Sequence, residues 1–364
     1  MHETLDSIQK KQRVKVGIVG SQFAAELHAK AYARCAHAEV VAAAAIDNLD
    51  PFCDKYGIPG RYADYRDMLN QADIDLVSVC VPNFLHHEVV MAAAAAGKHV
   101  VCEKPLATNL ADGAEMVQTC RERRVKLMYA EDWLFAPAIR RAKAIIDEGA
   151  IGDILFIKAK ETHLGSHSPF AKKVATCGGG SMIHLAIHPA AFVRWLAGSE
   201  VRDVMGKVTE GLDKNLVHRD FEGEDWGAGI LTLENGVRAL IEGNYITLGG
   251  MDDRIEIYGT RGNIHIELTM GSPITVYSQV GYSYVLEKAD MSTGWTRPAV
   301  DEEASLGYED EIAAFVQCVM DGTPPPAGAS GEDGLAALAV IEALYTSSRE
   351  GRAVDPQELV KELL

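Results

Sequence analysis

Short apolar runs alternate with helical stretches over the first 130 residues of the chain. Runs of this kind, bounded by turn residues, are typical of buried strands. They occur at Val14–Val19, Glu39–Ile46, Ile74–Pro82, His99–Cys102 and Lys126–Ala130. The stretches between them, such as Glu26–Cys35 and Glu88–Ala96, have the length and composition of helices. Strands that alternate with helices predict βαβ units and a doubly wound parallel sheet in residues 1–130.

Residues 131–364 have a different texture, with short strand-like runs at Ile154–Lys160, Gly227–Glu234, Val237–Tyr245, Arg254–Tyr258, Asn263–Glu267 and Ile274–Tyr277. Glu234-Asn235-Gly236, between two of these runs, is a hairpin signal. Helices are predicted at Pro137–Glu148, Ser181–Leu196, Glu309–Met320 and Glu332–Glu350. The pattern predicts an α/β chain whose second domain is α+β, with a mostly antiparallel sheet covered by helices on one face.

Composition narrows the class of protein. At 364 residues, with 48% hydrophobic and 24% charged residues, the chain has the profile of a two-domain globular protein. Its formal net charge of −17 argues against a nucleic-acid partner, because phosphate binding needs clustered Lys and Arg. The seven cysteines contain no C-x-x-C pair, so neither a disulfide framework nor a zinc ribbon is expected.

The same composition bears on location. Met1–Arg13 is polar and lacks the apolar segment of a secretory signal. No apolar run approaches the roughly 20 residues needed to span a bilayer. We therefore expect a cytoplasmic protein that binds neither nucleic acid nor membrane.

The turn after the first predicted strand has the form of a dinucleotide-binding fingerprint, G-x-G-x-x-G/A. It reads Gly20-Ser21-Gln22-Phe23-Ala24-Ala25. Gly20 permits the tight turn and Ala25 permits close packing of helix on strand, whereas Gln22 replaces the usual second glycine. The pattern predicts that residues 20–24 bind the pyrophosphate of a dinucleotide.

Asp47 and Asn48 follow the second predicted strand. A carboxylate at this point accepts hydrogen bonds from the adenosine ribose hydroxyls and repels a 2′-phosphate. No arginine follows Asp47 to bind that phosphate, so the sequence predicts NAD rather than NADP as the cofactor. The alternative interpretation is an ordinary turn, since Asp-Asn after a strand is common turn chemistry.

The stretch Gly97–Ala107 places two opposite charges at the end of a predicted strand. Gly97 ends an alanine-rich helix, Glu103 and Lys104 follow the strand, and Pro105 stops it. In open parallel sheets, ligands bind beyond the carboxyl ends of the strands. A lysine at that place can handle a proton. The alternative is a surface Glu–Lys pair with no chemistry.

Five blocks of the chain resemble the glucose–fructose oxidoreductase / inositol dehydrogenase / MocA (Gfo/Idh/MocA) family. They are Val16–Ala25 with His28, Pro82-Asn83-x-x-His86, Gly97–Pro105, Gly178–His188 and Glu256–Gly262. The resemblance covers nearly the whole chain, and Glu103-Lys104-Pro105 is its most specific part. It implies a Rossmann domain, an α+β domain with an open-faced sheet, and an active site in the cleft between them where NAD(P) oxidises a sugar or polyol.

The resemblance also implies roles for single residues. Lys104 and His188 match the catalytic lysine and histidine of the family. Positions near the nicotinamide and its ribose are matched by Pro82, Asn83, His86, Glu103 and Lys104. His184 stands where the family usually has aspartate, so the usual proton relay is altered. Pro189, directly after His188, is expected to kink the helix or to restart it.

His184 and His188 are spaced to share one face of a helix, and His163 lies upstream. Three hypotheses follow. Both histidines bond substrate hydroxyls, with one joining Lys104 in proton transfer; or they bind a metal with His163 or Glu161; or they pack the domain interface. We favour the first and expect no metal. The predicted substrate-binding set is then Lys104, Trp133, His163, His184 and His188, and the predicted catalytic set is Lys104, His184 and His188.

The sequence thus predicts an NAD-dependent dehydrogenase that takes a hydride from a secondary hydroxyl of a sugar, glycoside or inositol-like polyol. Two alternatives stay open: an NAD-assisted, metal-dependent hydrolase or lyase acting on a sugar, and a non-catalytic NAD-sensing protein. We also expect a homo-oligomer, a dimer or tetramer formed through the second-domain sheet, since large apolar patches are rarely left bare. The sequence identifies neither the substrate nor the direction of the reaction.

Overall fold

The computed structural model describes residues 13–166, 168–269, 276–280, 293–296, 302–361 and 363. Within these ranges it contains two six-stranded sheets and one two-stranded sheet. The expectation that Met1–Arg13 is not a secretory signal lies almost wholly outside the described residues. Among the described residues, no helix combines the length and the apolar character needed to cross a membrane.

The first sheet is parallel throughout, with the strand order β3-β2-β1-β4-β5-β6. Its strands are β1 (Val14–Val19), β2 (Ala38–Ala44), β3 (Gly60–Tyr62), β4 (Leu76–Val79), β5 (His99–Cys102) and β6 (Leu127–Tyr129). The connecting helices are α1 (Phe23–Arg34), α2 (Leu49–Tyr56), α3 (Tyr65–Gln71), α4 (His86–Ala95) and α5 (Leu110–Arg123). This order confirms the predicted doubly wound domain and places its switch point between β1 and β4.

The second sheet has the order β12-β11-β7-β10-β9-β8, and only the β7–β10 pair is parallel. Its strands are β7 (Ile154–Thr162), β8 (Val201–Val208), β9 (Trp226–Leu233), β10 (Arg238–Asn244), β11 (Arg254–Gly259) and β12 (Asn263–Glu267). The predicted mostly antiparallel sheet is confirmed. A short pair, β13 (Val276–Ser278) and β14 (Gly294–Thr296), overlaps the end of the predicted run Ile274–Tyr277, whose first two residues lie outside the described ranges.

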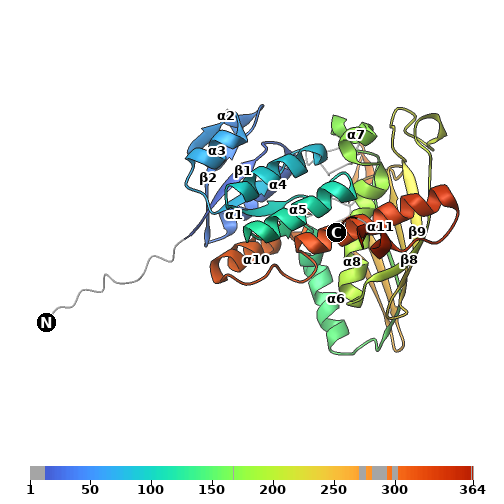
Figure 1. Cartoon of the computed structure of the whole chain (residues 1–364). Coiled ribbons are helices and arrows are strands. Elements are labelled where there is room, and N and C mark those ends of the chain that lie inside the picture. The colour runs from blue at the N-terminus through green and yellow to red at the C-terminus, as the bar shows by residue number, and fades with distance from the viewer. Residues whose placement is uncertain are drawn as a thin grey trace.

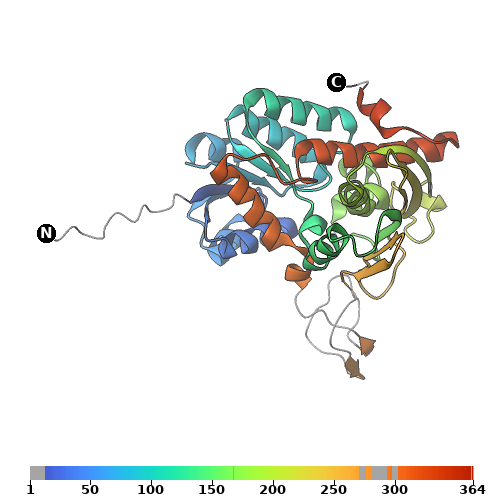
Figure 2. The same ribbon diagram turned by 90° about the horizontal axis from the view of Figure 1, so that it is seen from below.

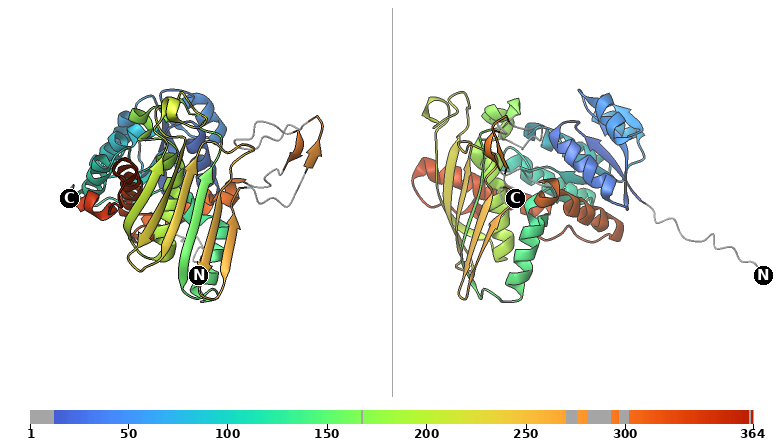
Figure 3. Two further views of the ribbon diagram at one scale, coloured as in Figure 1. Left: turned by 90° about the vertical axis from the view of Figure 1, so that its right-hand side faces the viewer. Right: turned by 180° about the vertical axis from the view of Figure 1, so that it is seen from behind.

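Helices cover one face of the second sheet and leave the other bare (Figures 1 and 3). The covering helices are α8 (Ile187–Ala197) and α11 (Gly331–Glu350), and α6 (Pro137–Asp147) packs near β12. On the bare face, Met205, Ile230 and Leu240 are cross-strand neighbours on β8, β9 and β10. The prediction of an open-faced sheet is therefore confirmed, with an apolar stripe across it.

The end of the chain returns to the first domain. Helix α10 (Tyr308–Asp321), which follows α9 (Glu302–Leu306), packs on α1. Figure 2 shows α10 on the face of the first sheet opposite α4 and α5. Helix α11 contacts α5 and β6, and the amide of Tyr129 donates to the carbonyl of Ala329 at 2.9 Å. The last helix is α12 (Pro356–Lys361). The boundary predicted at residue 130 stays a prediction.

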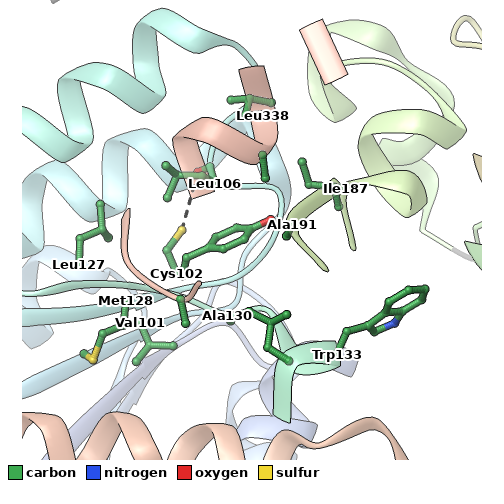
Figure 4. Close-up of a cluster of buried hydrophobic side chains, with 14 of the residues drawn as sticks. Val101, Cys102, Leu106, Leu127, Met128, Ala130, Trp133, Ile187, Ala191 and Leu338 are labelled. Carbon is green, nitrogen blue, oxygen red and sulfur yellow. Dashed lines mark hydrogen bonds between the residues drawn. The ribbon is translucent and has the colours of Figure 1, made fainter. Parts of the chain in front are cut away.

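One buried cluster joins these layers beside β5 and β6 (Figure 4). Cys102 and Met128 come from the first sheet, Ile187 from α8 and Leu338 from α11, and each is at most 2% exposed. Trp133, on the 3-10 turn Asp132–Phe135, closes the cluster on the side of α8. This packing holds the ends of β5 and β6 against α8.

Candidate active site

The turn after β1 is built for close approach of a ligand. Gly20 has φ +120°. A Cβ at this position would lie 2.2 Å from the carbonyl oxygen of Cys80, the residue that follows β4. Helix α1 begins at Phe23, and the side chain of its N-cap residue, Gln22, makes no capping hydrogen bond. The first amides of α1 are therefore not capped by that side chain, which suits binding of a phosphate at the helix N-terminus.

The end of β2 lies next to this turn. The Ser21 hydroxyl donates to the carbonyl oxygen of Asp47 at 2.7 Å, and the Asn48 side chain donates to the carbonyl of Ser21 at 3.0 Å. Asp47 and Asn48 are exposed, as is Ile46 at 96%. The structure thus brings the predicted pyrophosphate and ribose positions together at the switch point. These residues fit a dinucleotide.

Two of the predicted cofactor residues after β4 are engaged with the protein itself. The Asn83 side chain is buried and donates to the carbonyl of Cys177 at 2.9 Å. The ring nitrogens of His86 lie 2.8 Å from the carbonyl of Pro105 and 3.0 Å from that of Val81. Both side chains therefore position backbone around the site. Whether they also contact the cofactor stays a prediction, as it does for Pro82.

Glu103 forms a buried network behind Lys104. Its Oε1 lies 2.9 Å from His28 Nε2, and its Oε2 accepts a hydrogen bond from the Lys104 amide at 3.1 Å. His28 Nδ1 lies 2.8 Å from the Ser78 hydroxyl, which anchors the imidazole to β4. Burial works to raise the pKa of Glu103, but the hydrogen bond and charge of His28 hold that pKa below its ordinary value. Glu103 is thus an anion that orients the start of the Lys104 loop.

Lys104 reaches the second domain. Its ammonium donates to the main-chain carbonyl of His184 at 3.1 Å, and its side chain is half-buried. His184 lies in a π-helical turn, Met182–Ala186, that leads directly into α8. Pro189 is the third residue of α8, shortly after the change from π to α geometry. The helical run is continuous from Ser181 to Ala197, so no new helix starts at Pro189, and a kink there stays a prediction.

The rings of the two histidines point to different partners. His184 Nδ1 is hydrogen-bonded to the hydroxyl of Tyr245, the residue after β10. His188 Nδ1 lies 2.7 Å from Glu131 Oε1, and its ring stacks on Trp133 at a centroid distance of 5.6 Å. His188 is only 4% exposed, and His184 is partly exposed. The two histidines, predicted to share one face of a helix, therefore belong to two separate hydrogen-bonded pairs.

Carboxylates gather around His188. Glu131 and Asp132 follow β6, and Glu161 lies near the end of β7 with its Oε2 3.6 Å from His188 Nε2. Burial and the neighbouring acid Asp132 raise the pKa of Glu131 well above its ordinary value. Burial raises the pKa of Asp132 to about 7, against the opposing charge of Lys104. Burial, with the charges of Lys104 and His184, lowers the pKa of His188 well below its usual value.

The residues with metal-compatible spacing differ from those that the metal hypothesis predicted. In the described part of the chain, the group with metal-compatible spacing is Glu131, Asp132 and His188, whose donor atoms lie within 4.8 Å of one another. His184 is not a member, nor is His163, whose ring packs 5.5 Å from that of Tyr245. Glu131 and His188 are also already bonded to each other. The hydrogen bond between Glu131 and His188 explains, without a metal ion, why these two side chains lie so close together.

Comparison with known proteins decides the family. Residues 14–131 match the family described as "Oxidoreductase family, NAD-binding Rossmann fold", and residues 139–265 match the "GFO/IDH/MocA C-terminal domain". The chain belongs to the Gfo/Idh/MocA family of oxidoreductases.

Relatives in this family match over most of their length. The chain is 28% identical to an inositol 2-dehydrogenase of Rhizobium meliloti, covering 94% of this chain and 98% of the relative. It is 27% identical to a D-xylose 1-dehydrogenase [NADP(+)] of Haloarcula marismortui, covering 79% and 76%. Among solved structures, scyllo-inositol dehydrogenase from Lactobacillus casei with bound NAD(H) and scyllo-inositol superposes with a TM-score of 0.79, at 26% identity, and covers 95% of this chain and 100% of that one.

Three residues of this Gfo/Idh/MocA site were not predicted as site residues: Glu131, Asp132 and Tyr245. Glu131 is the second residue beyond β6, so its place at the carboxyl end of a parallel strand was a signal that could have found it. Tyr245 ends a strand-like run, and nothing in the sequence distinguishes it from a packing residue. Trp133, predicted to contact substrate, is 1% exposed and stacks on His188.

Proposed function

We propose that this protein is an NAD-dependent dehydrogenase that takes a hydride from a secondary hydroxyl of a sugar, glycoside or cyclic polyol. Lys104 and His188 handle the hydroxyl proton. The observation that carries the proposal is the hydrogen bond from Lys104 to the carbonyl of His184, which holds the lysine of the first domain beside the start of α8. A cationic donor and a buried imidazole at one place suit abstraction of a hydroxyl proton.

The substrate class rests on the relatives. Their names include inositol 2-dehydrogenase and D-xylose 1-dehydrogenase, and inositol and xylose both carry several hydroxyl groups. The site of this chain offers matching polar groups at Lys104, His184 and Glu161. His163, which packs on Tyr245, stays a predicted substrate contact.

For the cofactor we propose NAD over NADP. The exposed Asp47, held beside Ser21, supports this preference, because a carboxylate at the end of the second strand repels a 2′-phosphate. One relative is named as NADP-dependent, so members of this family differ in the preference. When bound, the cofactor accepts a hydride. Residues 20–24 orient its pyrophosphate, Asp47 its ribose hydroxyls, and Lys104 the reacting hydroxyl.

We further propose a homo-oligomer formed through the bare face of the second sheet. Met205 and Ile230 are 48% and 56% exposed there and are opposite each other on β8 and β9. Phe156 and Tyr258 stack on the same face, with ring centroids 6.0 Å apart. An apolar surface of this extent favours association. A cytoplasmic location stays a prediction.

The test is a turnover assay with purified protein, NAD or NADP, and a panel of inositols, pentoses, hexoses and glycosides. Formation of reduced nicotinamide is followed by absorbance. Reduction of NAD by at least one polyol supports the proposal. Release of a sugar fragment without net reduction would favour the NAD-assisted hydrolase or lyase. Tight NAD binding without turnover of any substrate would favour a sensing role.

A further inference from the structure

His188 is paired with Glu131, a carboxyl group to which the family resemblance gives no role. Glu131 lies just after β6 and His188 in α8, 57 residues further along the chain. Their side chains are 0% and 5% exposed. A 2.7 Å contact between two buried polar groups is a strong hydrogen bond with little competition from water.

The imidazole of His188 has one edge left for chemistry. Glu131 takes Nδ1, and the indole of Trp133 lies nearly parallel to the ring, at 13° between the planes. These two contacts fix the ring both in its plane and about its axis. The Nε2 edge remains, 3.6 Å from Glu161, a spacing beyond direct hydrogen bonding.

We propose that Glu131 is a positioning residue for His188: its carboxyl group fixes the imidazole and exchanges a proton with Nδ1, so that Nε2 can receive the substrate proton. This inference rests on the proposed dehydrogenase function. In this proposal, Glu131 supplies the carboxylate that the family usually carries at position 184. In this chain position 184 is a histidine, and its ring is bonded to Tyr245.

The proton balance closes within the pair. In the reactive form of the pair, hydrogen is on Nδ1, which donates a hydrogen bond to the Glu131 carboxylate and leaves the Nε2 lone pair free. As the substrate O–H bond breaks, its proton forms a bond to Nε2. The Nδ1–H bond breaks in turn and that proton moves to Glu131, while the C–H electron pair leaves as hydride to the nicotinamide. The pair ends as a carboxylic acid and an imidazole protonated at Nε2.

The charges around the pair suit this exchange. Burial raises the pKa of Glu131 and lowers that of His188, so Glu131 readily accepts the Nδ1 proton when the substrate proton reaches Nε2, and a buried imidazolium is avoided. The charged or titratable groups that face the pair come from each neighbouring element: Lys104, Asp132, Glu161, His184 and Glu311. The acids among them add to the rise in the pKa of Glu131 against the opposing charge of Lys104, and Lys104 and His184 add to the fall in the pKa of His188.

The first experiment reads the imidazole directly. In protein labelled with nitrogen-15 at histidine and loaded with NAD, the side-chain nitrogen shifts report which ring nitrogen carries hydrogen. His188→Gln identifies the signals of His188. We expect Glu131→Gln to change the tautomer balance of His188 and leave the other histidines unchanged. Unchanged His188 signals would overturn the proposal, and this readout decides even where no substrate has been found.

The second experiment measures coupling in turnover. We expect Glu131→Gln to lower kcat about 10²-fold with KM within about three-fold, as for loss of an orienting carboxylate beside a catalytic histidine. In the double variant with His188→Gln, the loss should equal that of His188→Gln alone, because Glu131 acts through His188. Losses that multiply would contradict the proposal.

Controls separate positioning from stability and from metal binding. Asp253→Asn removes another buried acid whose pKa burial raises, outside the groups that face the pair, and it should keep wild-type kcat and the wild-type pH profile. If Glu131→Gln does not fold, Glu131→Asp retains the acid but draws it back from Nδ1, and an intermediate loss is expected. One divalent ion per wild-type chain, absent from Glu131→Gln, would make Glu131 a metal ligand and overturn the assignment.

Discussion

The ammonium of Lys104 and the main-chain carbonyl of His184 are joined by a hydrogen bond of 3.1 Å across 80 residues of sequence. The acceptor is a backbone atom, so the contact is indifferent to the side chain at position 184. This explains how the chain keeps the lysine in place with histidine where the family usually has aspartate. The ring at 184 is hydrogen-bonded to Tyr245.

Replacing Lys104 tests the centre of the proposed mechanism. We expect Lys104→Ala to lower kcat by about 10²–10⁴-fold while NAD affinity stays within a few-fold, because in our proposal the lysine acts on the reacting hydroxyl and the turns after β1 and β2 hold most of the cofactor. Lys104→Arg should also lose activity, since the planar guanidinium does not reproduce the compact geometry of the ammonium. Lys55→Ala, at a surface pair with Glu26, is the control. Wild-type kcat in Lys104→Ala would refute the mechanism.

Asp47 should determine the choice between cofactors. We expect Asp47→Ser to narrow the difference in affinity between NAD and NADP, because removal of the carboxylate ends its repulsion of the 2′-phosphate. Fluorescence titration with both cofactors measures the difference. Asp54→Ser, which removes an exposed carboxylate on α2, should leave the ratio unchanged. An unaltered ratio in Asp47→Ser would show that Asp47 is only a turn residue.

Gly20 is predicted to admit no side chain. In Gly20→Ala the new methyl group would meet the Cys80 carbonyl at 2.2 Å, in a backbone conformation with φ +120°. We expect loss of NAD binding and a lower free energy of unfolding. Gly249→Ala isolates the backbone effect, because Gly249 has φ +89° with nothing within 4 Å of an added Cβ. Equal costs in the two variants would mean that the contact with Cys80 relaxes freely.

The buried acid Asp132 predicts a pH dependence of stability. Its pKa rises from the ordinary 3.8 to about 7 in the folded protein, so the folded state binds this proton more tightly than the unfolded state does. The stabilising contribution is present at low pH and is lost as the pH rises from about 4 to about 7. We therefore expect the stability of Asp132→Asn relative to wild type to increase over that window, by on the order of 1.4 kcal/mol for each pH unit crossed.

Urea unfolding at pH 5 and pH 8 measures this difference, using the same buffer ions at both values. Asp54→Asn, at a carboxylate whose side chain is 70% exposed, is the matched control and should show little change between the two conditions. A stability difference for Asp132→Asn that does not vary with pH would contradict the raised pKa.

The bare sheet face predicts a way to separate the subunits. Ile230→Glu places a charge in the middle of the Met205–Ile230–Leu240 stripe, and we expect it to convert the oligomer to monomer. Light scattering after size-exclusion chromatography measures the mass. Leu248→Glu, at a 72% exposed position outside the sheet, should retain the oligomer. A wild-type protein that is already monomeric would refute the proposed interface.

Most of the fold could be predicted from local pattern, because each βαβ unit carries its own apolar strand and helix. Strand β8 was missed: in Val201–Val208 buried residues are interspersed with Arg202, Asp203 and Lys207, so no continuous apolar run marks it. Its place is set by packing of α11 against it, a tertiary contact. The order of the second sheet, with β10 beside β7, likewise depends on pairings between distant segments.

The site was predictable in its residue types and less so in its pairings. Lys104 could be placed because a strand end and a proline mark its position in the sequence. The partners of His184 and His188 could not, since they come from 61 and 57 residues away. Helical spacing indicated that the two histidines share a face, but the π turn that contains His184 changes the geometry on which that inference depended.

The return of the last helices to the first domain has a consequence for synthesis on the ribosome. The edge strand β6 donates a hydrogen bond from the Tyr129 amide to the carbonyl of Ala329, and α10 covers α1. Both partners are late in the chain, so the nascent first domain emerges with these surfaces uncovered. At about 5–20 residues per second, the missing segments follow after roughly ten seconds or more. During that interval the apolar side of α1 is open to chaperones and to neighbouring nascent chains, and the order of translation becomes part of how this enzyme reaches its native state.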